Sequence, residues 1–76
     1  MILIYSKDNC PWCVKAKELL DAHGLEYIEL KFGQDFDADD LRARIGPDRK
    51  LTVPQIMFDD ELVGGFEDLQ KRLEDA

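Results

Sequence analysis

Two cysteines separated by two residues, Cys10 and Cys13, are the groups in this chain best suited to covalent chemistry. A helix is expected to begin at Pro11, because the N–H that proline lacks would have no partner at the first helical position. Two intervening residues in a first helical turn bring the two sulfurs within disulfide distance. The spacing therefore indicates transient redox work or metal binding, since two cysteines are too few for a secreted disulfide framework.

The expected surroundings favour Cys10 as the reactive thiol of the pair. Cys10 precedes the helix, where free backbone N–H groups and the positive end of the helix dipole stabilise an anion. Lys7, three residues earlier, adds positive charge. Such surroundings lower a thiol pKa from about 8.5 towards neutrality, and the thiolate is the attacking species. Cys13 lies one turn inside the helix, so it is expected to be more buried and to act as the resolving thiol.

Two other interpretations compete with redox chemistry. A pair of buried structural cysteines would explain the residues themselves, but not the proline, the lysine or the position at a helix start. A zinc site needs about four ligands, and only His23 and scattered carboxylates could complete the set. His23 is a full helix length from the cysteines. We therefore expect no bound metal.

Length and charge set further limits on function. The chain has 76 residues, which is enough for one domain with a small core, and its net charge is −7. A general binder of nucleic acid or of anionic membranes would need the opposite charge balance. The opening run from Met1 to Tyr5 has no basic flank and is too short for a signal peptide or a membrane span. We expect a soluble, cytoplasmic monomer.

Hydrophobic patterning predicts seven elements in the order β-α-β-α-β-β-α. The expected strands are Ile2 to Tyr5, Leu25 to Phe32, Gln55 to Phe58 and Glu61 to Val63. The first expected helix runs from Pro11 to a stop at Gly24, and the second runs from about Asp37 to Ile45. The third follows Gly64-Gly65 and has Phe66, Leu69 and Leu73 on one face. On the first helix, one predicted apolar face carries Trp12, Ala16, Leu19, Leu20 and His23. A right-handed crossover makes the first two strands parallel. The pattern predicts an α/β fold with a four-stranded mixed sheet and three helices.

Three segments resemble the signature segments of the glutaredoxins. They are Tyr5-Ser6-Lys7-Asp8-Asn9-Cys10-Pro11-Trp12-Cys13, Thr52-Val53-Pro54 and Gly64-Gly65-Phe66-Glu67-Asp68-Leu69, which follow the family's order over nearly the whole chain. A lone Cys-x-x-Cys motif is a weak signal, whereas the three segments together are specific. The resemblance implies a single glutaredoxin domain over residues 1–76, a thioredoxin fold, and glutathione-dependent reduction of disulfides.

The resemblance also implies a glutathione site. Cys10 would attack and pass through a mixed disulfide with glutathione, and Cys13 would resolve protein disulfides by closing the intramolecular bond. The implied glutathione contacts are Lys7, Trp12, Thr52, Val53, Pro54, Gly65, Phe66, Glu67 and Asp68. Trp12 stands where the family usually has tyrosine, and it is expected to pack beside the sulfur or partly in the core. Phe66 stands where a small residue is frequent, and its ring fits the core equally well.

Individual roles follow from the same resemblance. Pro54 is expected in the cis form, with the Val53 backbone free to pair with an extended peptide such as glutathione. The backbone N–H groups of Phe66 and Glu67 would hold the γ-glutamyl carboxylate, and Lys7 would hold the glycine carboxylate. Asp68 would meet the ligand's amino group, or simply favour the helix N-terminus. For a second contact to the glycine carboxylate, the available cations are Arg42, Arg44, Arg49 and Lys50.

These observations predict a small dithiol oxidoreductase with glutathione as its cosubstrate and no tightly bound cofactor. Its substrates would be protein disulfides and glutathionylated proteins, and the family suggests ribonucleotide reductase as one candidate. One alternative is a hydrogen donor that thioredoxin reductase recharges. Another is an iron–sulfur carrier, in which two chains share a cluster through Cys10 and glutathione. Pro11 and the bulk of Trp12 suit that carrier less well than a glycine-containing motif would.

Overall fold

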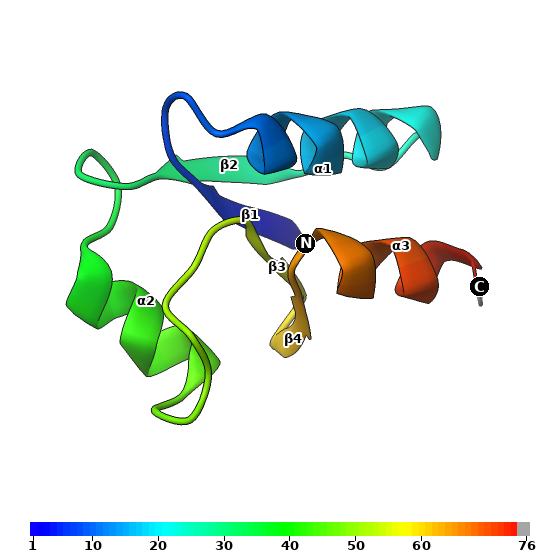
Figure 1. The fold of residues 1–76 in the computed structure, drawn as a ribbon. Helices are drawn as coiled ribbons and strands as arrows, with labels where there is room; N and C mark the ends of the chain where they lie inside the picture. Colours follow the sequence, from blue (N-terminus) through cyan, green and yellow to red (C-terminus); the bar gives the residue numbers. More distant parts are fainter. Residues whose placement is uncertain (75–76) are drawn as a thin grey trace.

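The computed structural model describes residues 1–74 and contains the expected order of elements (Figure 1). The elements are β1 (Ile2–Ser6), α1 (Pro11–Ala22), β2 (Ile28–Lys31), α2 (Ala38–Ile45), β3 (Gln55–Phe58), β4 (Glu61–Gly64) and α3 (Phe66–Glu74). The strands form one sheet in the spatial order β2-β1-β3-β4. β1 pairs parallel to β2 and antiparallel to β3, and β3 and β4 form the expected hairpin. The predicted mixed α/β fold is confirmed.

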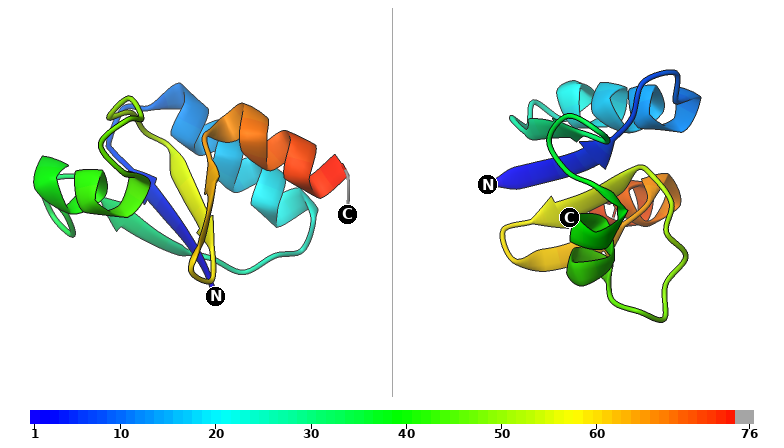
Figure 2. Two further views of the ribbon diagram at one scale, coloured as in Figure 1. Left: turned by 90° about the horizontal axis from the view of Figure 1, so that it is seen from below. Right: turned by 90° about the vertical axis from the view of Figure 1, so that its left-hand side faces the viewer.

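Helices cover both faces of the sheet (Figure 2). Successive side chains of a strand point to opposite faces, so the neighbours Ile4 and Tyr5 of β1 belong to different cores. The core under α1 and α3 contains Ile4, Ala16, Leu20, Ile56 and Leu69, and the core under α2 contains Tyr5, Phe36, Leu41, Ile45 and Met57. This two-sided burial explains the continuous apolar run at the start of the chain. Across residues 1–74, every helix is too short or too polar to span a bilayer.

Strand direction brings distant segments to one end of the sheet. Because β2 runs parallel to β1 and β3 runs antiparallel to it, the segments that follow β1 and β2 meet the segment that precedes β3. β4 is antiparallel to β3, so the segment that follows β4 ends there as well. Residues 7–10, 52–54 and 64–68 therefore lie at the same end of the molecule, although they are far apart in the sequence.

The predicted helix boundaries are largely confirmed. Asp37 caps α2, and its side chain accepts from the Asp40 backbone N–H while the Asp40 side chain accepts from the Asp37 N–H. This reciprocal pair is a capping box with aspartate in place of the usual glutamate. Gly24 and Gly46 follow α1 and α2 with φ of +67 and +92. Both helices thus end where the glycines predicted.

Two details of the prediction are wrong. The second strand covers only Ile28–Lys31, because the Leu25 backbone N–H still bonds to the Leu20 carbonyl of α1, and Phe32 makes only an isolated bridge. On α1, Trp12 and His23 are exposed, so neither belongs to the buried face. That face contains Cys13, Ala16 and Leu20, with Leu19 half-buried beside it. Cys13, rather than Trp12, therefore occupies the buried position in the first turn of α1.

The junction between β4 and α3 is crowded at Gly64. Its φ is +118, which residues with side chains rarely adopt, and a Cβ built there would overlap the Asp68 carboxylate. Asp68 is held in place because its Oδ2 accepts a 3.1 Å hydrogen bond from the Gly65 backbone N–H. At Gly65, a Cβ would lie 3.6 Å from the Pro54 carbonyl oxygen, which is an ordinary contact. The strict requirement for glycine therefore applies to the first residue of the pair.

Replacing Gly64 with alanine should destabilise the fold more than the same change at Gly33. Gly33 has φ of +84 with open space around it, so Gly33→Ala measures the backbone cost alone, about 1–2 kcal/mol. Gly64→Ala adds the overlap with Asp68, and its cost should shrink in an Asp68→Ala background. Urea denaturation of the four variants measures these differences. Equal losses at Gly64 and Gly33 would contradict the crowding argument.

Candidate active site

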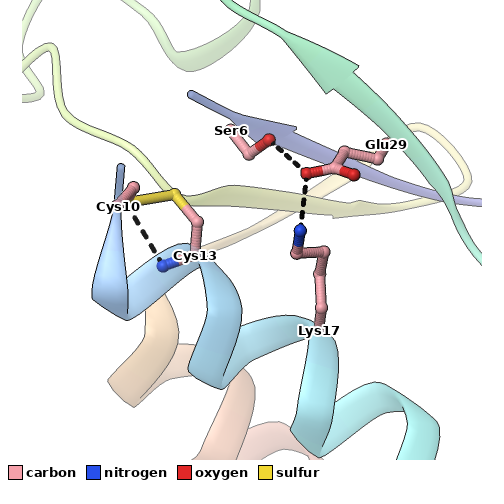
Figure 3. The surroundings of a disulfide bond; sticks show 5 residues. All are labelled: Ser6, Cys10, Cys13, Lys17 and Glu29. Atoms are coloured by element: carbon pink, nitrogen blue, oxygen red, sulfur yellow. Dashed lines mark hydrogen bonds and ion pairs between the residues drawn. A yellow bond between two sulfur atoms is a disulfide. The ribbon is translucent and has the colours of Figure 1, made fainter. Parts of the chain in front are cut away.

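Cys10 and Cys13 form a disulfide at the N-terminus of α1 (Figure 3). Their Cα atoms are 5.2 Å apart, as the first-turn spacing predicted. Cys10 is the N-cap residue of α1, Pro11 follows at the first position, and the Cys10 Sγ accepts a 3.2 Å hydrogen bond from the Cys13 backbone N–H. Cys10 retains 8% exposure and Cys13 only 1%, so an incoming disulfide reaches Cys10 more easily.

The N-cap position would stabilise a negative charge on the Cys10 sulfur. An N-cap side chain accepts from N–H groups that have no partner within the helix. After reduction, the same Cys13 N–H would point at the Cys10 sulfur, and the helix dipole would add to its stabilisation. Both effects favour the thiolate over the thiol. Geometry of this kind is suited to nucleophilic attack on a disulfide.

A groove of about 280 Å³ lies beside the disulfide-bearing helix turn. It is lined by Trp12, Thr52, Val53, Pro54, Gly65, Phe66, Glu67 and Asp68. These are all the predicted glutathione contacts except Lys7. Lys7 lines a neighbouring groove, which shares Thr52 and Val53 with the first. The structure thus brings eight predicted residues together and puts the ninth on the other side of the Thr52-Val53 segment.

The Thr52-Val53-Pro54 segment forms one wall of this groove. The Val53–Pro54 peptide bond is cis, as the family resemblance implied. Pro54 is buried and Val53 is half-buried, whereas Thr52 is exposed. The buried Gln55 side chain, at the first position of β3, donates a 3.3 Å hydrogen bond from Nε2 to the Thr52 Oγ1. The wall is therefore anchored to the start of β3.

Two aromatic rings form the opposite wall. The centroids of Trp12 and Phe66 are 5.4 Å apart with a tilt of 49°. The Lys15 ammonium lies 4.7 Å from the centre of the Trp12 ring, within the range of a cation–π contact. Trp12 is 53% exposed, so it lines the groove rather than the core, while Phe66 also packs against the core under α1 and α3.

The start of α3 closes the groove. Phe66 and Glu67 occupy the first turn, where backbone N–H groups have no partner within the helix. The Asp68 carboxylate accepts from the Gly65 N–H, so it completes the helix N-terminus. Of the two roles expected for Asp68, this contact matches the structural one. Two free N–H groups at a helix start are suited to binding a carboxylate.

A polar cluster that the sequence analysis missed lies close to the disulfide (Figure 3). The Glu29 Oε2 accepts from the Ser6 Oγ at 2.7 Å and from the Lys17 Nζ at 2.9 Å. Ser6 is fully buried, and the side chains of Lys17 and Glu29 are about one-quarter exposed. The hydrogen bond from Ser6, followed by the Lys17 ammonium, lowers the pKa of Glu29 against the opposing effect of burial. The sequence contained one signal for this cluster: Lys17 lies four residues after Cys13, so both project from the same side of the helix.

The loop before Cys10 has one charged residue in an ion pair, Asp8, and one that is exposed, Lys7. An ion pair of 3.1 Å between Lys31 of β2 and Asp8 ties this loop to the sheet, and Asp8 raises the pKa of Lys31. Lys7 itself is exposed. Neither of the two grooves is lined by the other cations considered for glutathione, which are Arg42, Arg44, Arg49 and Lys50.

Within residues 1–74, His, Cys, Asp and Glu side chains form no group of three placed to hold a metal ion.

Comparison with known proteins identifies related chains. A family model described as Glutaredoxin matches residues 2–63. Glutaredoxin 1 of Rickettsia bellii is 41% identical over 70 residues, which cover 90% of this chain and 71% of that protein. Glutaredoxin 3 of Escherichia coli K12 is 39% identical over 67 residues, covering 87% of this chain and 77% of the relative.

Solved structures give the same result for the fold. The crystal structure of glutaredoxin 1 from Francisella tularensis, complexed with cacodylate, superposes with a TM-score of 0.78 at 28% identity and covers 97% of this chain and 92% of its own. The crystal structure of a buckwheat glutaredoxin–glutathione complex superposes with a TM-score of 0.82 at 24% identity, covering 97% and 68%. Because the buckwheat protein is only 24% identical, this similarity supports the fold alone.

Neutralising Glu29 should weaken the fold in a pH-dependent way. Because the folded pKa of Glu29 is below its ordinary value of 4.5, the charged carboxylate stabilises the folded state above that pH, and the contribution is lost as pH falls through the folded pKa. Glu29→Gln should lower the free energy of unfolding by about 1 kcal/mol at pH 7, since it removes a charged hydrogen-bond acceptor. The difference should narrow below pH 4.5. Urea denaturation from pH 3 to 7 provides the measurement.

Glu26→Gln is the matched control for this experiment. Glu26 is exposed on the segment that precedes β2, so its neutralisation should change stability little at any pH. A loss in Glu29→Gln that is the same at pH 3 and pH 7 would show that the charge of Glu29 contributes nothing.

Proposed function

On the premise that this chain belongs to the glutaredoxin family of glutathione-dependent disulfide reductases, we propose that Cys10 is its nucleophile and Cys13 its resolving thiol. The observation that carries this assignment is the position of the two sulfurs. Cys10 is the N-cap residue of α1 and keeps 8% exposure, whereas Cys13 lies on the buried face of the same helix with 1%. The proposed thiolate is therefore the more accessible of the two sulfurs and is stabilised by the helix start, and the second thiol is sheltered until a mixed disulfide forms.

The proposed reaction has two branches. The Cys10 thiolate attacks one sulfur of a substrate disulfide, forms a mixed disulfide and releases the other sulfur as a thiolate, which takes up a proton. With a protein disulfide, deprotonated Cys13 then attacks the Cys10 sulfur, releases the reduced substrate and leaves the Cys10–Cys13 disulfide. With a glutathionylated protein, the mixed disulfide holds glutathione, and a second glutathione thiolate releases oxidised glutathione. Only the first branch needs Cys13.

Glutathione is proposed to lie across the wall formed by Thr52 and Val53. Its γ-glutamyl carboxylate would accept from the N–H groups of Phe66 and Glu67, and its backbone would pair with Val53 in the manner of an added strand. Its glycine carboxylate would then reach Lys7. Support comes from the shared lining, because Val53 borders both the groove at the start of α3 and the groove that contains Lys7. The buckwheat relative of similar fold was solved as a glutathione complex.

Serine variants separate the roles of the two cysteines. Cys10→Ser should abolish reduction of both protein disulfides and glutathionylated proteins, because the attacking thiolate is lost. Cys13→Ser should lose only the reduction of protein disulfides by the dithiol route. Turnover of a glutathionylated protein and, separately, of a protein disulfide, each coupled to glutathione reductase, provides the measurement for both variants. If iodoacetamide at neutral pH labels Cys13 before Cys10, the two roles must be exchanged.

Lys7→Ala should weaken the use of glutathione about tenfold, because a charge-assisted hydrogen bond contributes roughly 1.5–3 kcal/mol and 1.4 kcal/mol is one decade. Lys71→Ala is the matched control, since Lys71 is an exposed lysine of α3 that lines neither groove. The same assay should be run with thioredoxin reductase as the electron source. Efficient turnover with that reductase alone, together with indifference to Lys7, would favour the alternative hydrogen-donor function.

A further inference from the structure

The groove that contains Lys7 is larger and more apolar than a contact for one carboxylate requires. Its volume is about 430 Å³, and it is lined by Lys7, Phe32, Ala38, Leu41, Leu51, Thr52 and Val53. Phe32 and Leu51 are 53% and 37% exposed, although both are large apolar side chains. The lining segments are the loops that follow β1 and β2, the first turns of α2, and the segment that precedes β3 (Figure 1).

This groove is continuous with the active site. Thr52 and Val53 line both grooves, so the Thr52-Val53 segment is the boundary between them. An extended chain that pairs with the Val53 backbone and is bonded to Cys10 has two directions in which to continue. One direction leads to the start of α3, and the other leads past Lys7 towards Phe32 and Leu51.

Glutathione would leave most of this second groove empty. In the proposed orientation its chain ends at the glycine carboxylate beside Lys7, and glycine has no side chain to place against Phe32, Leu41 or Leu51. A polypeptide bound in the same direction continues beyond this point and carries side chains. The apolar lining therefore fits a longer substrate than glutathione, because such a groove binds a ligand mainly by burying the ligand's apolar surface.

We propose that this groove, defined by Phe32, Leu41, Leu51 and Val53, binds an apolar side chain that follows the reactive cysteine in a polypeptide disulfide substrate. The inference rests on the proposed function and names its preferred protein substrates: extended segments with a leucine-sized residue one or two positions after the cysteine. Lys7 at the rim pairs with a carboxylate of the same segment. Fully burying one such side chain raises the specificity constant by about tenfold or more.

Three short peptides, each supplied as its symmetrical disulfide, test the proposal. They have the sequences Ser-Gly-Cys-Gly-Leu-Ser, Ser-Gly-Cys-Gly-Ser-Ser and Ser-Leu-Gly-Cys-Gly-Ser, so that leucine follows the cysteine, is absent, or precedes it. Oxidised glutathione is the reference substrate. The reduced protein is mixed with each disulfide, and the rate at which its own Cys10–Cys13 disulfide forms is followed by mass spectrometry.

The expected result is a preference of about tenfold for leucine after the cysteine over both other peptides. Leu51→Ser should reduce this preference to less than about threefold, and Ala38→Phe, which fills the groove, should do the same. The rate of each variant with oxidised glutathione is measured in parallel, and each peptide rate is divided by it, so that a general loss of activity is not counted as a loss of preference. Val14→Ser is the control, because Val14 is an apolar residue of similar exposure, 49%, that lines neither groove.

The proposal is overturned if the unaltered protein shows no preference among the three peptides. It is also overturned if the preference survives both Leu51→Ser and Ala38→Phe, or if leucine before the cysteine works equally well. Failure to react with oxidised glutathione would instead contradict the proposed function itself, so the two kinds of failure are distinguishable.

Discussion

The sulfur proposed as the nucleophile is also the sulfur that caps a helix. Cys10 accepts a hydrogen bond from the Cys13 backbone N–H, and this contact exists only because α1 begins directly after β1 and its short loop. A thiolate at an N-cap satisfies a donor that the helix cannot satisfy by itself. Reactivity and local folding therefore depend on the same geometry. Any change that delays or advances the start of α1 would move the proposed nucleophile and remove its hydrogen bond from the Cys13 N–H together.

The buried face of α1 holds that geometry in place. Ala16 and Leu20 are inaccessible to solvent and pack with Ile4 of β1, so the helix cannot rotate without opening the core. Cys13 lies on this same face, one turn earlier. At the far side of the groove, the start of α3 is held by Leu69, which belongs to the same core. The two helix N-termini that frame the groove are thus positioned by a single cluster of apolar side chains.

Local signals in the sequence predict the helices and strands well, whereas contacts between residues on different strands and helices are harder to predict from it. Proline at the start of α1, Asp37 before α2 and glycines after both helices each act within one turn, so they could be read directly. The shortened second strand and the exposure of Trp12 depend on how α1 lies against the sheet. The same is true of the Ser6–Glu29–Lys17 cluster, whose members meet only because Glu29 sits beside β1 in the parallel register. Family resemblance, rather than periodicity, supplied the cis form of Pro54.

Trp12 has a consequence for how the molecule can be observed. It is the one tryptophan in the chain, it is half exposed, and it lies between the two sulfurs in sequence, with its ring against Phe66 and under the Lys15 ammonium. Indole emission is quenched by a nearby disulfide and changes with the polarity and charge around the ring. We therefore expect the emission intensity of Trp12 to differ between the disulfide and dithiol forms of Cys10 and Cys13, so that the oxidation state can be followed without any added label.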